Sequence, residues 1–439
     1  MYIDKFEQPV RVVSDRRYKS YQRANLKNIA REHIPEDIAT ELEVTSLVFP
    51  FRVNDYVLDE LIDWDNIPSD PMFRLLFPMS EMLDKASYQR LLELVRERGD
   101  KALIQQEVEK IRASLNPHPS GQVTKNRPAI NGKPLNGFQH KYKETLLYFP
   151  SQAQYCHAYC SYCFRWAQFT AKATRMNNND AELLFDYLAR HQELTDVLLT
   201  GGDPMTMRAN KMRKYLEVML RDECQHIKNI RIGTKSLAFW PSRFVSDGDA
   251  QELCNLFRKV VEHGKSVALM AHFSHPNELS TPIVRRAIRN LQTSGVTIRT
   301  QAPLMKGIND NPDIWVEMWN LQVSLGLIPY YMFIDRDTGA KGYFEVPLER
   351  ALEIYTLAYR KISGLCKTVR GPVMSTDPGK IQLLDISIVN GEKVFCLQFI
   401  QARNPEWINK VFFAQYNCEA TWIDQLKPAF GKNYFFWEV

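Results

Sequence analysis

Three cysteines stand close together in the middle of the chain, in a spacing that suits metal chemistry. Cys156, Cys160 and Cys163 form a CxxxCxxC run directly after an apolar, strand-like segment at 145–150. A closed structural metal site normally takes four protein ligands. A [4Fe-4S] cluster held by three thiolates instead keeps one iron open to bind and reduce a small molecule. The spacing therefore favours a catalytic cluster over two alternatives, a zinc site with a distant fourth ligand or three unrelated cysteines.

The composition limits where such a site can work. With 439 residues, 45% of them hydrophobic, the chain can form one large domain with appendages, or two to three domains. The net charge of +5 makes no strong electrostatic case for a nucleic-acid partner. We expect no membrane span and no secretory signal, because no long apolar run occurs. Five further cysteines are scattered singly, which predicts a reducing cytoplasm.

The elements that would position the cysteines follow a repeating pattern. Residues 1–120 read as a helical region and 121–144 as a linker or wrapping segment. From 145 to 365, apolar strand-like runs alternate with segments of helix length. Such alternation predicts parallel βαβ units, here an α/β fold with a partial (β/α)6 barrel, and a complete eight-unit barrel is the competing interpretation. The six runs are 146–149, 197–200, 230–233, 267–270, 297–300 and 329–334.

The C-terminal segment, 366–439, is expected to form an extension that contains β-strands. Asn390-Gly391 lies between two β-rich runs and predicts a hairpin turn. The last residues, 433–439, are too aromatic for a loose terminus. We expect them to pack against the barrel or to contact a second subunit, so a homo-oligomer is a further expectation.

Reactive groups of a parallel barrel gather at the carboxyl ends of its strands. The cysteine run follows the first predicted strand, and Gly201-Gly202-Asp203 follows the second. Adjacent glycines let a backbone approach a ligand closely. His272 and His275 follow the fourth strand and could be metal ligands, although no matching partner is evident.

The cysteine run resembles the signature loop of the radical S-adenosylmethionine (SAM) enzymes. Further segments resemble the lysine 2,3-aminomutase family, in the same order and spacing from about 140 to 370. The resemblance implies a radical SAM isomerase that also carries pyridoxal 5′-phosphate. In that family a 5′-deoxyadenosyl radical abstracts the β-hydrogen of an amino acid, and the α-amino group migrates to Cβ. The segments are 196–203, 231–234, 272–278, 304–310 and 329–331.

The resemblance also implies roles for individual residues. Cys156, Cys160 and Cys163 would ligate the cluster, and Arg165 would grip the substrate carboxylate. A planar guanidinium suits that task through paired hydrogen bonds, the alternative being a salt bridge at the barrel rim. The residues that would line or approach SAM are Gly201, Gly202, Asp203, His272 and Gln301.

The pyridoxal site departs from the family pattern. Lys380, in a shortened Asp377-Pro-Gly-Lys380 segment, is the candidate for the pyridoxal lysine, and Asp377 is a candidate substrate contact. A plain turn with a solvated lysine is the alternative. Of the two basic residues that the family uses for the phosphate, Lys141 replaces one. The other position falls on Thr145, for which Lys143 is a substitute.

The residue expected to select the substrate also departs from the family pattern. Lysine-specific members have an aspartate after the sixth strand that receives the substrate ammonium, and that position falls on Arg336, between Asp335 and Asp337. A cation there repels a lysine side chain and suits an anionic one. The hypothesis is therefore an acidic α-amino acid, although a one-residue shift would restore an aspartate and lysine.

Two other functions compete with the aminomutase. One is a pyridoxal-independent radical SAM enzyme, such as an epimerase, a dehydratase or another mutase. The other is a zinc or iron–sulfur protein that binds or modifies RNA. The expected partners of the aminomutase are an amino-acid substrate, with a lysine of a protein as an alternative, and a reductant such as flavodoxin or ferredoxin.

Overall fold

One open sheet forms the centre of the computed structural model, which describes residues 19–97, 99–116, 125–170 and 176–438. Its eleven strands follow the order β15-β14-β13-β12-β11-β10-β9-β8-β7-β6-β5. Neighbours from β6 to β12 run parallel, and the sheet stays open because β5 and β15, its two end strands, do not pair with each other. The parallel strands are β6 (Thr145–Tyr148), β7 (Asp196–Leu199), β8 (Asn229–Thr234), β9 (Ser266–His272), β10 (Thr297–Leu304), β11 (Ile328–Ile334) and β12 (Arg370–Ser375).

Helices follow the first six parallel strands in turn, which confirms the predicted partial (β/α)6 barrel. Each strand buries Val, Ile and Leu side chains beneath amphipathic helices. The seventh strand, β12, was not predicted, because Gly371 and Pro372 interrupt its apolar run. The helices are α7 (Trp166–Thr170), α8 (Ala181–Arg190), α9 (Ala209–Val218), α10 (Ser236–Phe239), α11 (Ala250–Glu262), α12 (Pro282–Thr293), α13 (Pro312–Ser324), α14 (Lys341–Phe344) and α15 (Leu348–Lys361).

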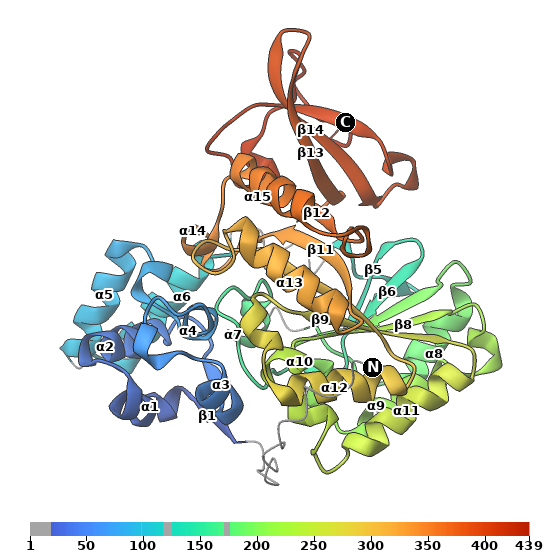
Figure 1. The fold of residues 1–439 in the computed structure, drawn as a ribbon, viewed down its shortest axis with the longest axis horizontal. Helices are drawn as coiled ribbons and strands as arrows, with labels where there is room; N and C mark the ends of the chain where they lie inside the picture. The colour runs from blue at the N-terminus through green and yellow to red at the C-terminus, as the bar shows by residue number, and fades with distance from the viewer. Residues whose placement is uncertain (1–18, 98, 117–124, 171–175, 439) are drawn as a thin grey trace, which may run out of the picture.

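The described part of the N-terminal region, 19–116 without residue 98, is mainly helical, as predicted, and packs beside the barrel (Figure 1), whereas 1–18 and 117–124 lie outside the described residues. Asn54, Asp70, Asp84 and Asp100 cap four of its helices through side-chain oxygens. Its buried residues join the core of the barrel in one hydrophobic cluster. Its elements are β1 (Ser20–Gln22), α1 (Leu26–His33), α2 (Glu36–Thr45), β2 (Arg52–Asn54), α3 (Asp55–Glu60), α4 (Pro71–Leu76), α5 (Lys85–Arg96) and α6 (Lys101–Ser114).

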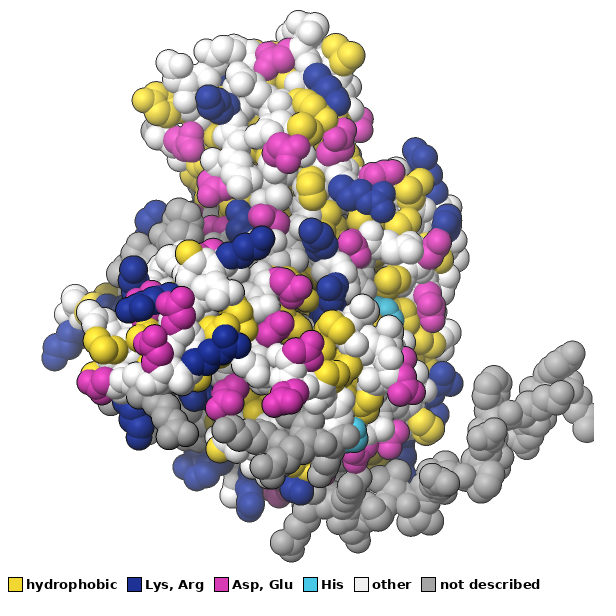
Figure 2. All heavy atoms as spheres, turned by 90° about the vertical axis from the view of Figure 1, so that its left-hand side faces the viewer, with side chains coloured by type: hydrophobic (Ala, Val, Ile, Leu, Met, Phe, Trp, Pro, Cys, Tyr) yellow, Lys and Arg dark blue, Asp and Glu magenta, His cyan; other side chains and the backbone are white. Residues whose placement is uncertain are grey.

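The outer face of this region carries mixed charge. Among the described residues in Figure 2, basic and acidic side chains are interspersed, without the broad basic patch that nucleic-acid binding uses. No helix in the described part of the chain is long and apolar enough to cross a bilayer.

Between the helical region and the barrel, the chain forms short strands. β3 (Ala129–Ile130) pairs with β4 (Lys133–Pro134), and β5 (Phe138–Tyr142) runs antiparallel to β6. This path brings Lys141 to the edge of the barrel beside its first parallel strand.

The C-terminal extension continues the sheet with antiparallel strands. β13 (Gly379–Val389) and β14 (Glu392–Ala402) form the predicted hairpin, and β15 (Val411–Gln415) pairs with β14. Asn390 and Gly391 both have positive φ, at 52° and 81°, as a two-residue hairpin turn requires. The hairpin projects beyond the barrel in Figure 1. The aromatic tail packs on these strands, where Trp437 lies 5.1 Å from Phe399 and 4.8 Å from Phe412 between ring centroids.

Candidate active site at the carboxyl ends of the barrel strands

The cysteine run forms the loop between β6 and α7. All three thiols are free, and burial raises the pKa of Cys160 to about 12, that of Cys163 to about 11 and that of Cys156 well above its usual range. Such thiols give up their protons only when a metal replaces them.

The spacing of the sulfurs tests which metal group fits. One tetrahedral zinc holds two thiolate sulfurs roughly 3.8 Å apart. In the described part of the chain, one group of three potential ligand atoms lies within 4.8 Å of one another, and it belongs to His140, His191 and Glu193. The three cysteine sulfurs are therefore not all within 4.8 Å of one another. The described cysteine loop therefore does not hold all three sulfurs at the spacing of a single zinc ion.

That histidine group lies elsewhere and is satisfied by hydrogen bonds. His140 contacts the Tyr187 hydroxyl through Nδ1 at 2.7 Å and the Lys143 carbonyl oxygen through Nε2 at 3.1 Å. His191 contacts Glu193 at 2.8 Å. Both ring nitrogens of His140 are thus used within the protein, and we assign no metal to the group.

Gly201 and Gly202 are required by the approach of the cysteine loop. A Cβ at Gly202 would lie 2.6 Å from the backbone of Tyr155, and one at Gly201 would lie 2.5 Å from Gln154 Nε2. The Gly202 amide donates to the Ala153 carbonyl at 2.7 Å. The glycine pair after β7 therefore docks the start of the cysteine loop.

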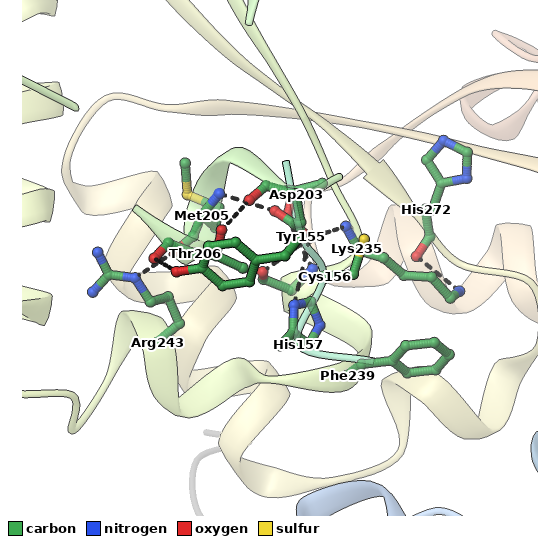
Figure 3. Close-up of polar contacts among 12 residues, drawn as sticks. Tyr155, Cys156, His157, Asp203, Met205, Thr206, Lys235, Phe239, Arg243 and His272 are labelled. Carbon is green, nitrogen blue, oxygen red and sulfur yellow. Dashed lines mark hydrogen bonds and ion pairs between the residues drawn. The ribbon is translucent and has the colours of Figure 1, made fainter. Parts of the chain in front are cut away.

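Asp203 joins three loops at this end of the barrel (Figure 3). Its buried carboxylate accepts from Thr234 Oγ1, at the end of β8, at 2.7 and 2.8 Å and from the amide of Lys235, the next residue, at 3.0 Å. His157, within the cysteine loop, lies 3.7 Å away. Because these contacts occupy the carboxylate, Asp203 holds the loops around the predicted SAM site.

The buried pair of Lys235 and Glu278 was missed by sequence reasoning. Lys235 Nζ donates to Glu278 Oε1 at 2.6 Å and lies 3.4 Å from Ser274 Oγ. Ser274 in turn contacts the hydroxyl of Tyr162, between two of the cysteines, at 3.2 Å. The signal was present, since both residues stand in segments after strands, but a lysine and a glutamate 43 residues apart show no pairing in sequence.

His272 and Gln301, both predicted near SAM, contact each other. The Gln301 amide nitrogen lies 2.7 Å from His272 Nε2, so this ring nitrogen accepts and the imidazole is neutral. Burial, with Lys235 and Arg165 nearby, lowers the pKa of His272 to about 3. A neutral imidazole can donate or accept one hydrogen bond without adding charge beside the cysteine loop.

Arg165 offers an unpaired cationic group to the barrel interior. One of its terminal nitrogens, buried from solvent, has no hydrogen-bond partner among the described residues, and the guanidinium lies 4.6 Å from the centre of the Phe149 ring. Burial lowers its pKa to about 10, so it stays charged at neutral pH. A carboxylate would satisfy this group.

Lys380 lies on β13 and reaches into the barrel. Its Nζ donates to Gln401 Oε1 at 2.5 Å and lies 4.9 Å from the centre of the Tyr331 ring. Burial, with Arg231 and Lys141 nearby, lowers its pKa to about 7. Lys380 is therefore an enclosed lysine, half neutral at physiological pH, which is the state in which an amine attacks a carbonyl.

Lys141 and Arg403 converge on the turn before Lys380. Lys141 Nζ donates to the Thr376 carbonyl at 2.5 Å, and burial with Arg403 nearby lowers its pKa to about 7. Arg403 donates to Asp377 through the backbone carbonyl at 2.9 Å and the carboxylate at 2.8 Å. Asp377 also pairs with Lys125 at 2.7 Å, and its side chain is half-exposed. Sequence reasoning missed Arg403, because it enters from the end of β14.

Arg336 lies between two aromatic rings. Its guanidinium is 5.7 Å from the ring centres of Phe164, in the cysteine loop, and Trp422, in the C-terminal extension. Asp337 is 3.4 Å away, and burial raises the pKa of Asp335 to about 8. A mainly neutral Asp335 leaves the positive charge of Arg336 less compensated.

Comparisons with known proteins identify relatives of this chain. Over 398 residues the chain is 32% identical to a putative L-lysine 2,3-aminomutase of Aquifex aeolicus, which covers 90% of this chain and 92% of that protein. It is 29% identical over 234 residues to L-lysine 2,3-aminomutase of Clostridium subterminale, covering 53% of each chain. It is 28% identical over 212 residues to glutamate 2,3-aminomutase of Clostridioides difficile, covering 48% of this chain and 47% of that protein.

No family model matches the chain. Among solved structures, a radical SAM methyltransferase from Sphaerobacter thermophilus shares 15% identity at a TM-score of 0.38, covering 54% of this chain and 68% of the other.

Proposed function

Because the chain belongs to the lysine 2,3-aminomutase family, we propose that it is a radical SAM amino-acid 2,3-aminomutase that uses a [4Fe-4S] cluster, SAM and pyridoxal 5′-phosphate. When bound, the cluster with SAM supplies a hydrogen-abstracting radical, and pyridoxal supplies an electron sink for the migrating amino group. The protein binds and orients these groups and excludes water.

The cysteine loop is assigned to the cluster. Cys156, Cys160 and Cys163 provide three thiolates, and the docked Gly201-Gly202 segment keeps the loop against the end of β7. His272, at the end of β9, and Gln301, within β10, present neutral polar groups to the predicted SAM site. Neutral groups suit this place, because SAM brings both a positive sulfur and a carboxylate.

The Lys380 side of the barrel is assigned to pyridoxal phosphate. Lys380 is enclosed and has a pKa near 7, so its amine can react with the aldehyde at neutral pH. Lys141 and Arg403 stand beside it at the 376–378 turn and supply positive charge for the phosphate. Arg403 would then supply the second basic group for the phosphate, because this sequence has Thr145 at the position where the family has a basic residue.

The guanidinium of Arg165 supports an amino-acid substrate. It is charged and enclosed, and one of its nitrogens has no hydrogen-bond acceptor among the described residues. A substrate carboxylate would pair with it. Arg336, fixed between Phe164 and Trp422, provides a second cation near Arg165. Two carboxylates on one substrate would use both cations, so an acidic α-amino acid is the proposed substrate.

Two further proposals concern the protein's reductant and its location in the cell. A one-electron reductant such as flavodoxin or ferredoxin is the proposed partner, because the cluster must be reduced before SAM is cleaved. The eight cysteines are all free, which fits the proposed cytoplasmic location.

The test is a cofactor trap. Protein purified without oxygen is reduced with borohydride in the presence of pyridoxal phosphate, digested and searched for a pyridoxyl group by mass spectrometry. The group is expected on Lys380 and not on the nearby Lys141, with Lys380→Ala as the unlabelled control. Protein that holds its iron and cleaves SAM but carries no pyridoxyl group at Lys380 would favour a pyridoxal-independent radical SAM reaction.

A further inference from the structure

The N-terminal region contacts the cysteine loop directly. The Tyr159 amide donates to the Arg52 carbonyl at 2.8 Å, and the Ser161 amide donates to the Leu75 carbonyl at 2.8 Å. Ser161 Oγ donates to the Arg74 carbonyl at 2.7 Å. These bonds hold the residues on either side of Cys160, so the loop owes part of its shape to a region outside the barrel.

The barrel holds the rest of the loop. Gly202 and Asp203 pair with the backbone at Ala153 and Tyr155, before the first cysteine. Tyr162, after the second, contacts Ser274. The N-terminal segment therefore holds Tyr159 and Ser161 in the middle of the loop, whereas the barrel holds both ends of the loop and places Asp203 3.7 Å from His157.

Arg52 makes the side-chain part of this contact. Its guanidinium donates to the Cys156 carbonyl at 3.2 Å and lies 5.5 Å from the ring centre of Tyr159 and 5.9 Å from that of Tyr155. Its Nε is buried without a hydrogen-bond partner among the described residues. A positive group with a spare donor thus stands beside a loop that collects negative charge when its thiols become thiolates.

The N-terminal segment is itself fixed to other barrel loops. Asn54 Nδ2 donates to the Phe239 carbonyl at 2.8 Å, and Tyr56 contacts Thr281 at 2.8 Å. Asn54 is fully buried. Residues 52–77 therefore contact the loops that follow β6, β8 and β9, and the helices of this segment, α3 and α4, lie beside the barrel (Figure 1).

We propose that this segment forms one wall of the cluster chamber and that Arg52 is a positioning residue for the cluster, an inference that rests on the proposed function of the cysteine loop. The Arg52 contacts hold the Cys156 backbone in place and add positive charge near the cluster. Partners behind the ligands in this way orient them and tune the redox potential. Losing the charge disfavours reduction, because reduction adds a negative charge.

The test compares full-length variants reconstituted with iron and sulfide without oxygen. Arg52→Met keeps the apolar stem, Arg52→Lys restores the charge, and Arg90→Met is the control, since Arg90 is exposed and its ion pair, with Glu93 at 3.8 Å, lies on the surface. The readouts are the rate at which a chelator bleaches the cluster, the electron paramagnetic resonance spectrum of the reduced cluster and its midpoint potential.

Arg52→Met is expected to bleach about tenfold faster or more and to have a more negative midpoint potential. Arg52→Lys should recover the potential in part, and Arg90→Met should match wild type. Wild-type bleaching, spectrum and potential in Arg52→Met would overturn the inference. If Arg52→Met does not fold, Ser161→Ala is measured instead, because it removes only the hydrogen bond to the Arg74 carbonyl. A wild-type bleaching rate in Ser161→Ala would contradict the proposal that residues 52–77 form a wall of the cluster chamber. A wild-type chain that takes up no cluster would instead refute the proposed function.

Discussion

Lys380 is expected to capture pyridoxal phosphate with a rate that is half-maximal near pH 7. Only the neutral amine attacks the aldehyde, and the structure lowers the pKa of Lys380 from 10.5 to about 7. At pH 7 about half of the amines are then neutral, compared with roughly 3 in 10,000 for an ordinary lysine. The expected advantage in reactive amine is therefore about 1,500-fold.

The pKa of Lys380 is lowered, and not raised, because of the groups that surround its ammonium. Burial disfavours the charged ammonium most, and among the neighbouring charges Arg231 has the largest effect, followed by Lys141. Arg231 also pairs with Asp196 at 2.6 Å. Arg231→Met removes a repelling cation and leaves the Asp196 anion unpaired, so both changes favour the charged lysine and raise its pKa.

The assay measures how fast cofactor-free protein gains borohydride-trapped pyridoxyl groups between about pH 5.5 and 10. Pyridoxal without phosphate is run in parallel, so that ionisation of the phosphate is separated from that of the lysine. The midpoint should lie near pH 7 in wild type and higher by about one unit in Arg231→Met. A wild-type midpoint above about pH 9 would refute the assignment of Lys380 as an enclosed, activated amine.

Three further changes test other parts of the site. Cys160→Ser should prevent assembly of an intact cluster, measured as iron and sulfide per chain, whereas Cys224→Ser, outside the loop, should not. Gly202→Ala should destabilise the protein by about 1–3 kcal/mol in denaturant unfolding, because its Cβ would meet the Tyr155 backbone at 2.6 Å. Gly248→Ala, with nothing within 4 Å, is the matched control, and an equal effect would count against loop docking. Arg336→Asp should lower kcat/KM for an acidic amino acid by about tenfold or more and improve turnover of lysine, while strong lysine turnover by wild type would exclude the acidic substrate.

The sequence predicted the parts of this protein that local patterns determine. The (β/α)6 alternation, the Asn390-Gly391 turn and the cysteine loop each depend on residues that are close together in the chain. Strand–helix alternation places the Cys, Gly-Gly-Asp and His segments at one end of the barrel, because parallel strands share the direction of their carboxyl ends.

The parts that were missed depend on contacts between distant residues. Lys235 and Glu278 form a buried pair across two loops, and Arg403 approaches Lys141 from a strand beyond the barrel. The N-terminal region was predicted to be helical, but most of its hydrogen bonds to the cysteine loop use the backbone carbonyls of Arg52, Arg74 and Leu75. Backbone bonds of this kind leave little trace in residue types, so periodicity could not predict them.

The most direct measurement uses enzyme reconstituted without oxygen with its cluster, SAM, pyridoxal phosphate and a chemical reductant. It is given glutamate or lysine deuterated at Cβ, and the products are analysed by mass spectrometry. An acidic β-amino acid, with deuterium in the recovered 5′-deoxyadenosine and no product when pyridoxal phosphate is left out, is the predicted result. SAM cleavage without any β-amino acid, or a product that forms equally well without pyridoxal phosphate, would contradict it.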